Sequence, residues 1–197
     1  MQKHPAIIGI FGGIVGTVLV GIAVWLLIAY TGAYNVAASQ QHFDPVRWTL
    51  DTTRNRSIAN RAGGADISET APESVLSDGA RHYAQSCAYC HGAPGEEPAE
   101  WARGMRPEPP HLSEAASEWS KQEIHWIVTN GIKMTGMPAF GAHHSANEIA
   151  AITSFVSALP GLTPDDYTRL AGRASGQAEQ GSSTPAGSSR DTQPEDE

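Results

Sequence analysis

The sequence predicts an all-α protein in which one apolar N-terminal helix precedes a small helical domain. Two observations predict the helices of the domain. Ser120-x-x-Glu123 and Ser145-x-x-Glu148 are capping boxes, in which the Ser and the Glu satisfy backbone groups where a helix starts. A third observation, the run of residues 6–30 without a charged side chain, predicts the N-terminal helix.

The N-terminal run is long enough to cross a membrane. A helix rises about 1.5 Å per residue, so the run spans a hydrocarbon core of roughly 30 Å with some tilt. The apolar region of a cleavable signal peptide has about 7–15 residues. We therefore expect residues 1–32 to be an uncleaved transmembrane anchor, with cleavage near Gly32 as the alternative. Lys3 precedes the run and no Lys or Arg follows it before Arg47, which predicts a cytoplasmic N-terminus and an external remainder.

Composition divides the rest of the chain into three parts. Residues 33–74 are polar, and we expect a tether, with a short extended segment where residues 46–50 alternate. Residues 75–170 carry the helical patterns and form the expected domain. Residues 171–197 are Ser, Gly, Gln, Pro and acidic residues, which bury too little apolar surface to fold, so we expect a disordered tail.

Charge and cysteine content exclude two classes of protein. The formal net charge is −8, which argues against a nucleic-acid partner, because phosphate binding depends on Lys and Arg. The chain has 2 cysteines, and they stand three positions apart. A disulfide-stapled secreted fold has more cysteines at wider spacing.

The cysteines belong to the most informative motif of the chain, Cys87-Ala88-Tyr89-Cys90-His91. C-x-x-C-H is typical of c-type haem attachment: each thiol adds to one vinyl group, and the histidine provides an imidazole nitrogen to the iron. A thioredoxin-like C-x-x-C requires a βαβ context, which the pattern lacks. A structural zinc site requires a second ligand pair, and the adjacent pair His143-His144 is poorly placed to share a tetrahedral site.

A methionine downstream is the candidate for the second axial ligand. Met137 precedes Pro138 in a loop that also contains Gly131 and Gly136, so core packing is the weaker explanation for it. Thioether sulfur with histidine is the ligation of electron-carrying cytochromes. Met134 is the competitor, and we favour Met137.

Helical patterns surround these motifs. Residues 77–86 predict a helix leading into the attachment motif, with Gly79 and Tyr83 on one face. A glycine inside a helix is costly unless a close crossing requires it, and the apolar stripe around Phe155 is the expected crossing partner. Pro160-Gly161 ends the helix that carries this stripe, and Pro164 starts a last short helix.

Residues 75–160 resemble the class I c-type cytochrome family. The resemblance rests on Gly79-x-x-x-Tyr83-x-x-x-Cys87-x-x-Cys90-His91-Gly92, on Pro109-Pro110-His111-Leu112, and on Gly136-Met137-Pro138-Ala139-Phe140. It implies an all-α fold around one covalently bound haem, in which the N- and C-terminal helices of the domain cross.

The resemblance also implies roles for individual residues. The Pro110 carbonyl would accept a hydrogen bond from His91 and fix the tautomer of its ring. Leu112, Trp126 and Phe140 would line the haem pocket. His111 departs from the Asn or Asp common at its position. The anchor and the segment after it resemble membrane-bound monohaem cytochromes of respiratory complexes or periplasmic dehydrogenases.

We therefore expect a one-electron carrier, not an enzyme, on the periplasmic side of the inner membrane. The acidic surplus suggests redox partners with a basic docking face. One alternative is a haem enzyme or gas sensor whose sixth position opens, with a distal group among His111, His125, His143 and His144. Another is a mainly structural subunit of a membrane complex, attached through the Gly-x-x-x-Gly pairs of the anchor.

Overall fold

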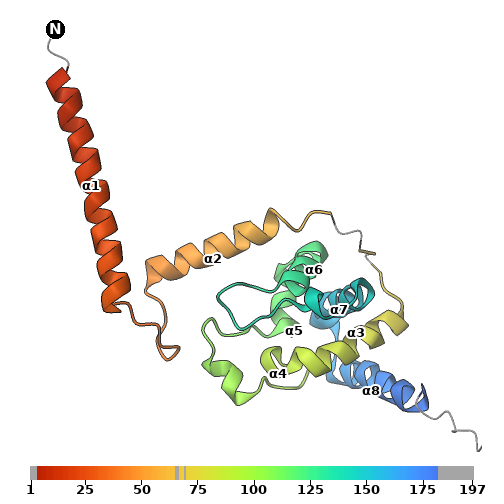
Figure 1. Ribbon diagram of the computed structural model, residues 1–197. Coiled ribbons are helices and arrows are strands. Elements are labelled where there is room, and N and C mark those ends of the chain that lie inside the picture. The colour runs from red at the N-terminus through yellow and green to blue at the C-terminus, as the bar shows by residue number, and fades with distance from the viewer. Residues whose placement is uncertain (1–3, 65–66, 69, 182–197) are drawn as a thin grey trace, which may run out of the picture. The chain divides into compact units, whose positions relative to one another are not determined.

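The computed structural model describes residues 4–64, 67–68 and 70–181 (Figure 1). The chain divides into two compact units, residues 1–41 and 42–197. Within the described residues the regular elements are helices, as predicted.

The first unit contains α1, His4–Thr31. At 28 residues and about 1.5 Å per residue it is about 42 Å long. Residues 7–31 are apolar and long enough to cross a membrane, judged by length and composition. Gly32 follows with φ of +64°, the left-handed conformation that commonly ends a helix. The apolar N-terminal helix is thus present.

The second unit begins with α2, Asp44–Ala59, where the sequence suggested an extended segment within an irregular tether. That expectation was wrong. Pro45 stands in the first turn, where its fixed φ suits a helix. The inward face carries Arg54 and Ile58, and Ile58 is only 1% exposed. Alternation over residues 46–50 was too short to distinguish strand from helix, and burial against the domain favours the helix.

The helical domain follows in chain order. Its longer helices are α3 Glu73–Ser86, α6 Lys121–Asn130, α7 Ala146–Ala158 and α8 Pro164–Gly181. Short elements connect them: α4 Ala88–His91, α5 Leu112–Ala115 and the 3-10 helices Glu100–Gly104, Ala116–Glu118, Phe140–Ala142 and Leu159–Gly161. The last helix is longer than predicted, because α8 continues past Leu170 to Gly181. The remainder of the predicted tail, residues 182–197, lies outside the described residues.

The predicted capping boxes are both formed. The Ser120 side chain accepts a hydrogen bond from the Glu123 amide, and the Glu123 carboxylate accepts one from the Ser120 amide. Ser145 and Glu148 exchange the same two bonds at the start of α7. These bonds satisfy amides that have no partner inside the helix.

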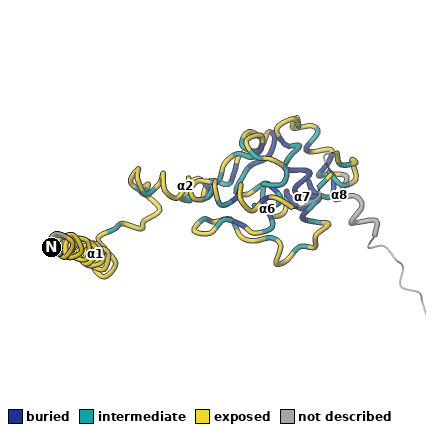
Figure 2. Tube along the Cα trace, turned by 90° about the horizontal axis from the view of Figure 1, so that it is seen from above, coloured by how far each residue is buried: buried dark blue, intermediate teal, exposed yellow. Residues whose placement is uncertain are grey.

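The core lies where α3 meets α7 and α8 (Figures 1 and 2). Tyr83 and Phe155 are fully buried, with ring centroids 5.3 Å apart. The Tyr83 hydroxyl donates a 2.6 Å hydrogen bond to the Gly92 carbonyl oxygen, just after the attachment motif. Packing between α3 and α7 therefore also fixes the end of the motif.

Candidate functional site

A cavity of about 340 Å³ opens beside the attachment motif. Its walls come from α4, α5, α6, α7, the segment of residues 105–110 and the loop of residues 132–138, with α2 adding one side chain. Apolar side chains dominate the lining, among them Leu112, Trp119, Ile127, Ile132, Phe140 and Val156. A mostly apolar cavity with a few polar groups is typical of a cofactor site.

Both cysteines of the motif lie at the wall of this cavity. Cys87 ends α3 and Cys90 lies in α4, the single turn that follows. Burial raises the pKa of the Cys87 thiol to about 12, and the neighbouring Cys90 acts in the same direction. Among the described residues no group of three or more His, Cys, Asp or Glu side chains could hold a metal ion, so the two thiols lack the second ligand pair of a structural zinc site. Two thiols at one cavity wall suit covalent attachment of a group inside it.

His91 also lines the cavity, and a hydrogen bond to the backbone holds its ring in place. The Nδ1 atom lies 2.8 Å from the Pro110 carbonyl oxygen. A carbonyl oxygen can only accept, so Nδ1 carries the proton and Nε2 keeps its lone pair. Burial lowers the pKa of His91, which favours the neutral ring. The predicted contact with Pro110 is present, and it leaves Nε2 as a donor for a metal.

The loop that carries Met137 is tightly built. Gly131 ends α6 with φ of +64°, and a Cβ atom there would lie 2.6 Å from the Pro138 carbonyl oxygen. The Met137 amide donates to the Thr135 hydroxyl at 3.1 Å, and the Met137 carbonyl accepts from the Ile132 amide at 3.2 Å. These contacts hold the Met137 backbone beside the cavity.

The two methionines that were candidates for the axial ligand lie in different environments. Met137 lines the cavity, whereas Met134 has φ of 63° and a 75% exposed side chain. Met105, which no sequence pattern marked as a site residue, also lines the cavity. Its terminal methyl group fills the space over Gly136, where a Cβ atom would lie 1.8 Å from Cε. Met105 therefore has a packing role against the loop, and Met137 is the better candidate for an axial ligand.

Of the other residues predicted to line the pocket, three do so and one does not. Pro110, Leu112 and Phe140 line the cavity. Trp126 is half-buried but is not among the lining residues, so the structure does not bring it into the predicted pocket.

The spacing along α6 explains the position of Trp126. The α6 residues at the cavity are Ile124, Ile127 and Val128, which share one face of the helix. Trp126 is two positions from both Ile124 and Val128, so it lies on another face. Trp119, which precedes α6, provides the indole ring at the cavity instead.

The histidines considered as distal groups lie elsewhere. Among the described residues, His91 is the only histidine that lines the cavity. The His144 Nδ1 atom lies 3.3 Å from the Phe140 carbonyl oxygen, and the His125 Nδ1 atom lies 3.4 Å from the Thr153 hydroxyl. His111 lies 3.8 Å from the Glu97 carboxylate, and His143 is exposed.

A protein-family comparison agrees with this site. Residues 74–156 match the family described as cytochrome c oxidase, cbb3-type, subunit III. These residues form a class I c-type cytochrome domain. No curated protein and no solved structure matches the chain significantly.

The cofactor of the cytochrome c domain is one covalently bound haem c. The cavity suits it, because two thiols, a neutral imidazole and a thioether lie at its walls and the remaining lining is largely apolar. Bound haem supplies an iron that takes up and releases one electron. The domain is thus an electron-transfer module, and α1 is consistent with membrane anchoring.

Proposed function

We propose that the protein is a one-electron carrier whose haem is attached through Cys87 and Cys90 and ligated by His91 and Met137. The observation that carries the proposal is the placement of these four residues around one cavity. The attachment fixes the haem, the Pro110 contact fixes the His91 ring, and the 131–138 loop fixes Met137. A site whose two axial donors are both held by the fold changes little between oxidation states, as electron transfer requires.

The proposal includes a location. The apolar α1 acts as a single-pass anchor, and the positive-inside rule places the cytochrome c domain in the periplasm. Confinement to the membrane raises the effective concentration of the haem near membrane partners. Partners with a basic docking face suit the acidic chain. The description of the matched family names an oxidase subunit, which supports a place in or beside a respiratory complex.

Redox titration of the full-length protein in detergent tests the proposal. We expect a single one-electron transition, and carbon monoxide should leave the spectrum of the ferrous protein unchanged because Met137 occupies the sixth position. Rapid stoichiometric binding of carbon monoxide would contradict a closed site and favour the haem enzyme or gas sensor. Protease treatment of spheroplasts tests the location: the domain should be digested, and protection would contradict a periplasmic placement.

A further inference from the structure

Helix α2 lies outside the family match but contributes to the cavity. The match begins at residue 74, whereas α2 ends at Ala59. Ile58 is 1% exposed and α2 contacts α6, so the helix is seated on the cytochrome c domain within the second unit. One turn before Ile58, Arg54 lines the cavity. The helix thus brings a cationic side chain to the haem site.

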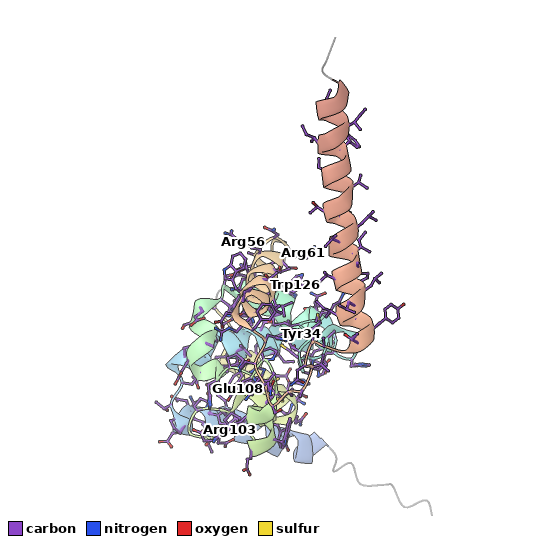
Figure 3. The ribbon with its side chains drawn as sticks, turned by 90° about the vertical axis from the view of Figure 1, so that its left-hand side faces the viewer. Tyr34, Arg56, Arg61, Arg103, Glu108 and Trp126 are labelled. Atoms are coloured by element: carbon purple, nitrogen blue, oxygen red, sulfur yellow. The ribbon has the colours of Figure 1, made fainter. Side chains whose placement is uncertain are left out.

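Arg54 differs from the other arginines of the segment. Its side chain is 32% exposed, whereas Arg56 and Arg61 are exposed residues, both labelled in Figure 3. Its guanidinium is oriented by its own helix: Nη1 lies 3.1 Å from the Asp51 carboxylate, and Nε donates to the Asn55 side chain at 3.0 Å. An oriented guanidinium loses less rotamer freedom when it binds a further group.

The charges of the cavity lining indicate what Arg54 binds. Among the described residues, Arg54 is the only Lys or Arg in the lining, and Glu108 and Glu118 are its acidic members. Haem adds two propionate carboxylates. Taking carboxylates into a largely apolar cavity is costly unless a cation or donor pairs with them, and Arg binds carboxylates through paired hydrogen bonds.

We propose that Arg54 is a haem-positioning residue whose guanidinium binds a propionate carboxylate and raises the reduction potential of the haem. A nearby positive charge stabilises the ferrous state, which carries one positive charge less than the ferric state. The N-terminal segment is then part of the haem site as well as a connection to the anchor. Replacing Arg54 shifts the redox equilibrium without removing an axial ligand.

The test compares reduction potentials of the full-length holoprotein and three variants. Arg54→Gln should lower the ferrous-to-ferric ratio at a fixed ambient potential about tenfold, which is about 59 mV for one electron. Arg54→Lys should keep most of the reduction potential of the parent protein, because it keeps the charge. Arg56→Gln is the matched control, which removes the same charge from the exposed part of the same helix, and its potential should stay close to that of the parent.

Hydrogen exchange of α2 in the same samples shows whether a changed reduction potential comes from the lost charge or from a helix that no longer packs on the domain. Unchanged protection of α2 in Arg54→Gln with a lowered potential supports the proposal. Equal reduction potentials in Arg54→Gln and Arg56→Gln would overturn the proposal. An equal fall in Arg54→Gln and Arg54→Lys would also overturn it, because the shape of the side chain and not its charge would then set the potential. Because every variant keeps the thioethers and both axial candidates, these outcomes leave the proposed electron-carrier function untouched.

Discussion

Gly79 of α3 and Ala151 of α7 touch through their backbones. A Cβ atom at Gly79 would lie 2.2 Å from the Ala151 carbonyl oxygen and 2.7 Å from Phe155 Cβ. No side chain fits in this space. The contact explains a glycine inside a helix and confirms the predicted crossing with the stripe around Phe155.

Gly79→Ala should therefore destabilise the cytochrome c domain. The new methyl group forces α3 and α7 apart, and overpacking of this kind costs about 1–3 kcal/mol of unfolding free energy. Denaturant unfolding of the holoprotein, followed by helical circular dichroism, measures the loss. The matched control is Gly172→Ala in α8, where a Cβ atom would have no neighbouring atom within 4 Å. Unchanged stability in Gly79→Ala would show that the two helices can separate without cost.

The covalent attachment is tested by removing both thiols. Cys87→Ala with Cys90→Ala should abolish the haem-stained band on a denaturing gel, because no thioether can then form. Met134→Leu, at an exposed position, should keep the band and serves as the control. Immunoblotting of the same gel shows how much protein is present. A stained band that persists in the double variant would refute attachment through these cysteines.

The stability of the domain should depend on pH through His82. This histidine is 7% exposed, and its Nε2 atom lies 3.6 Å from Glu148 and 3.8 Å from Asp78. Burial and the adjacent Arg81 lower its pKa below 6.5, with a smaller contribution from His144, while the two carboxylates act in the opposite direction. The unfolded chain then binds the proton more readily than the folded domain.

The stabilising contribution of His82 to the free energy of unfolding is accordingly fully present above the unfolded pKa of 6.5. It is lost as the pH falls toward the lower folded pKa. His82→Gln should reduce the difference in unfolding free energy between about pH 7.5 and about pH 5.5. His143→Gln, at an exposed position, should leave that difference as it is. An unchanged difference in His82→Gln would assign the acid sensitivity to other groups.

Local signals in the sequence were sufficient for much of the fold. The capping boxes at Ser120 and Ser145 depend on residues three positions apart, so the sequence alone contains both partners. Gly79 was informative because its cost inside a helix requires a close neighbour. The hydrogen bond between His91 and Pro110 was expected from the family resemblance and is present.

Other features depend on contacts between distant residues. Helix α2 was missed because its seating relies on Ile58 and Arg54 meeting a domain that lies further along the chain. Met105 and Trp119 lie outside the longer helices, so no periodicity marked them as cavity residues. Trp126 could have been placed better, since Ile124, Ile127 and Val128 already define the inward face of α6.

Ligation of the haem iron by Met137 is tested by the near-infrared spectrum of the ferric full-length protein. Coordination of iron by methionine gives a weak charge-transfer band there. We expect the band in the parent protein and in Met134→Leu and Met105→Leu, and we expect Met137→Ala to remove it and lower the reduction potential. Absence of the band from the parent, or its loss in Met134→Leu or Met105→Leu with retention in Met137→Ala, would contradict the proposed ligation.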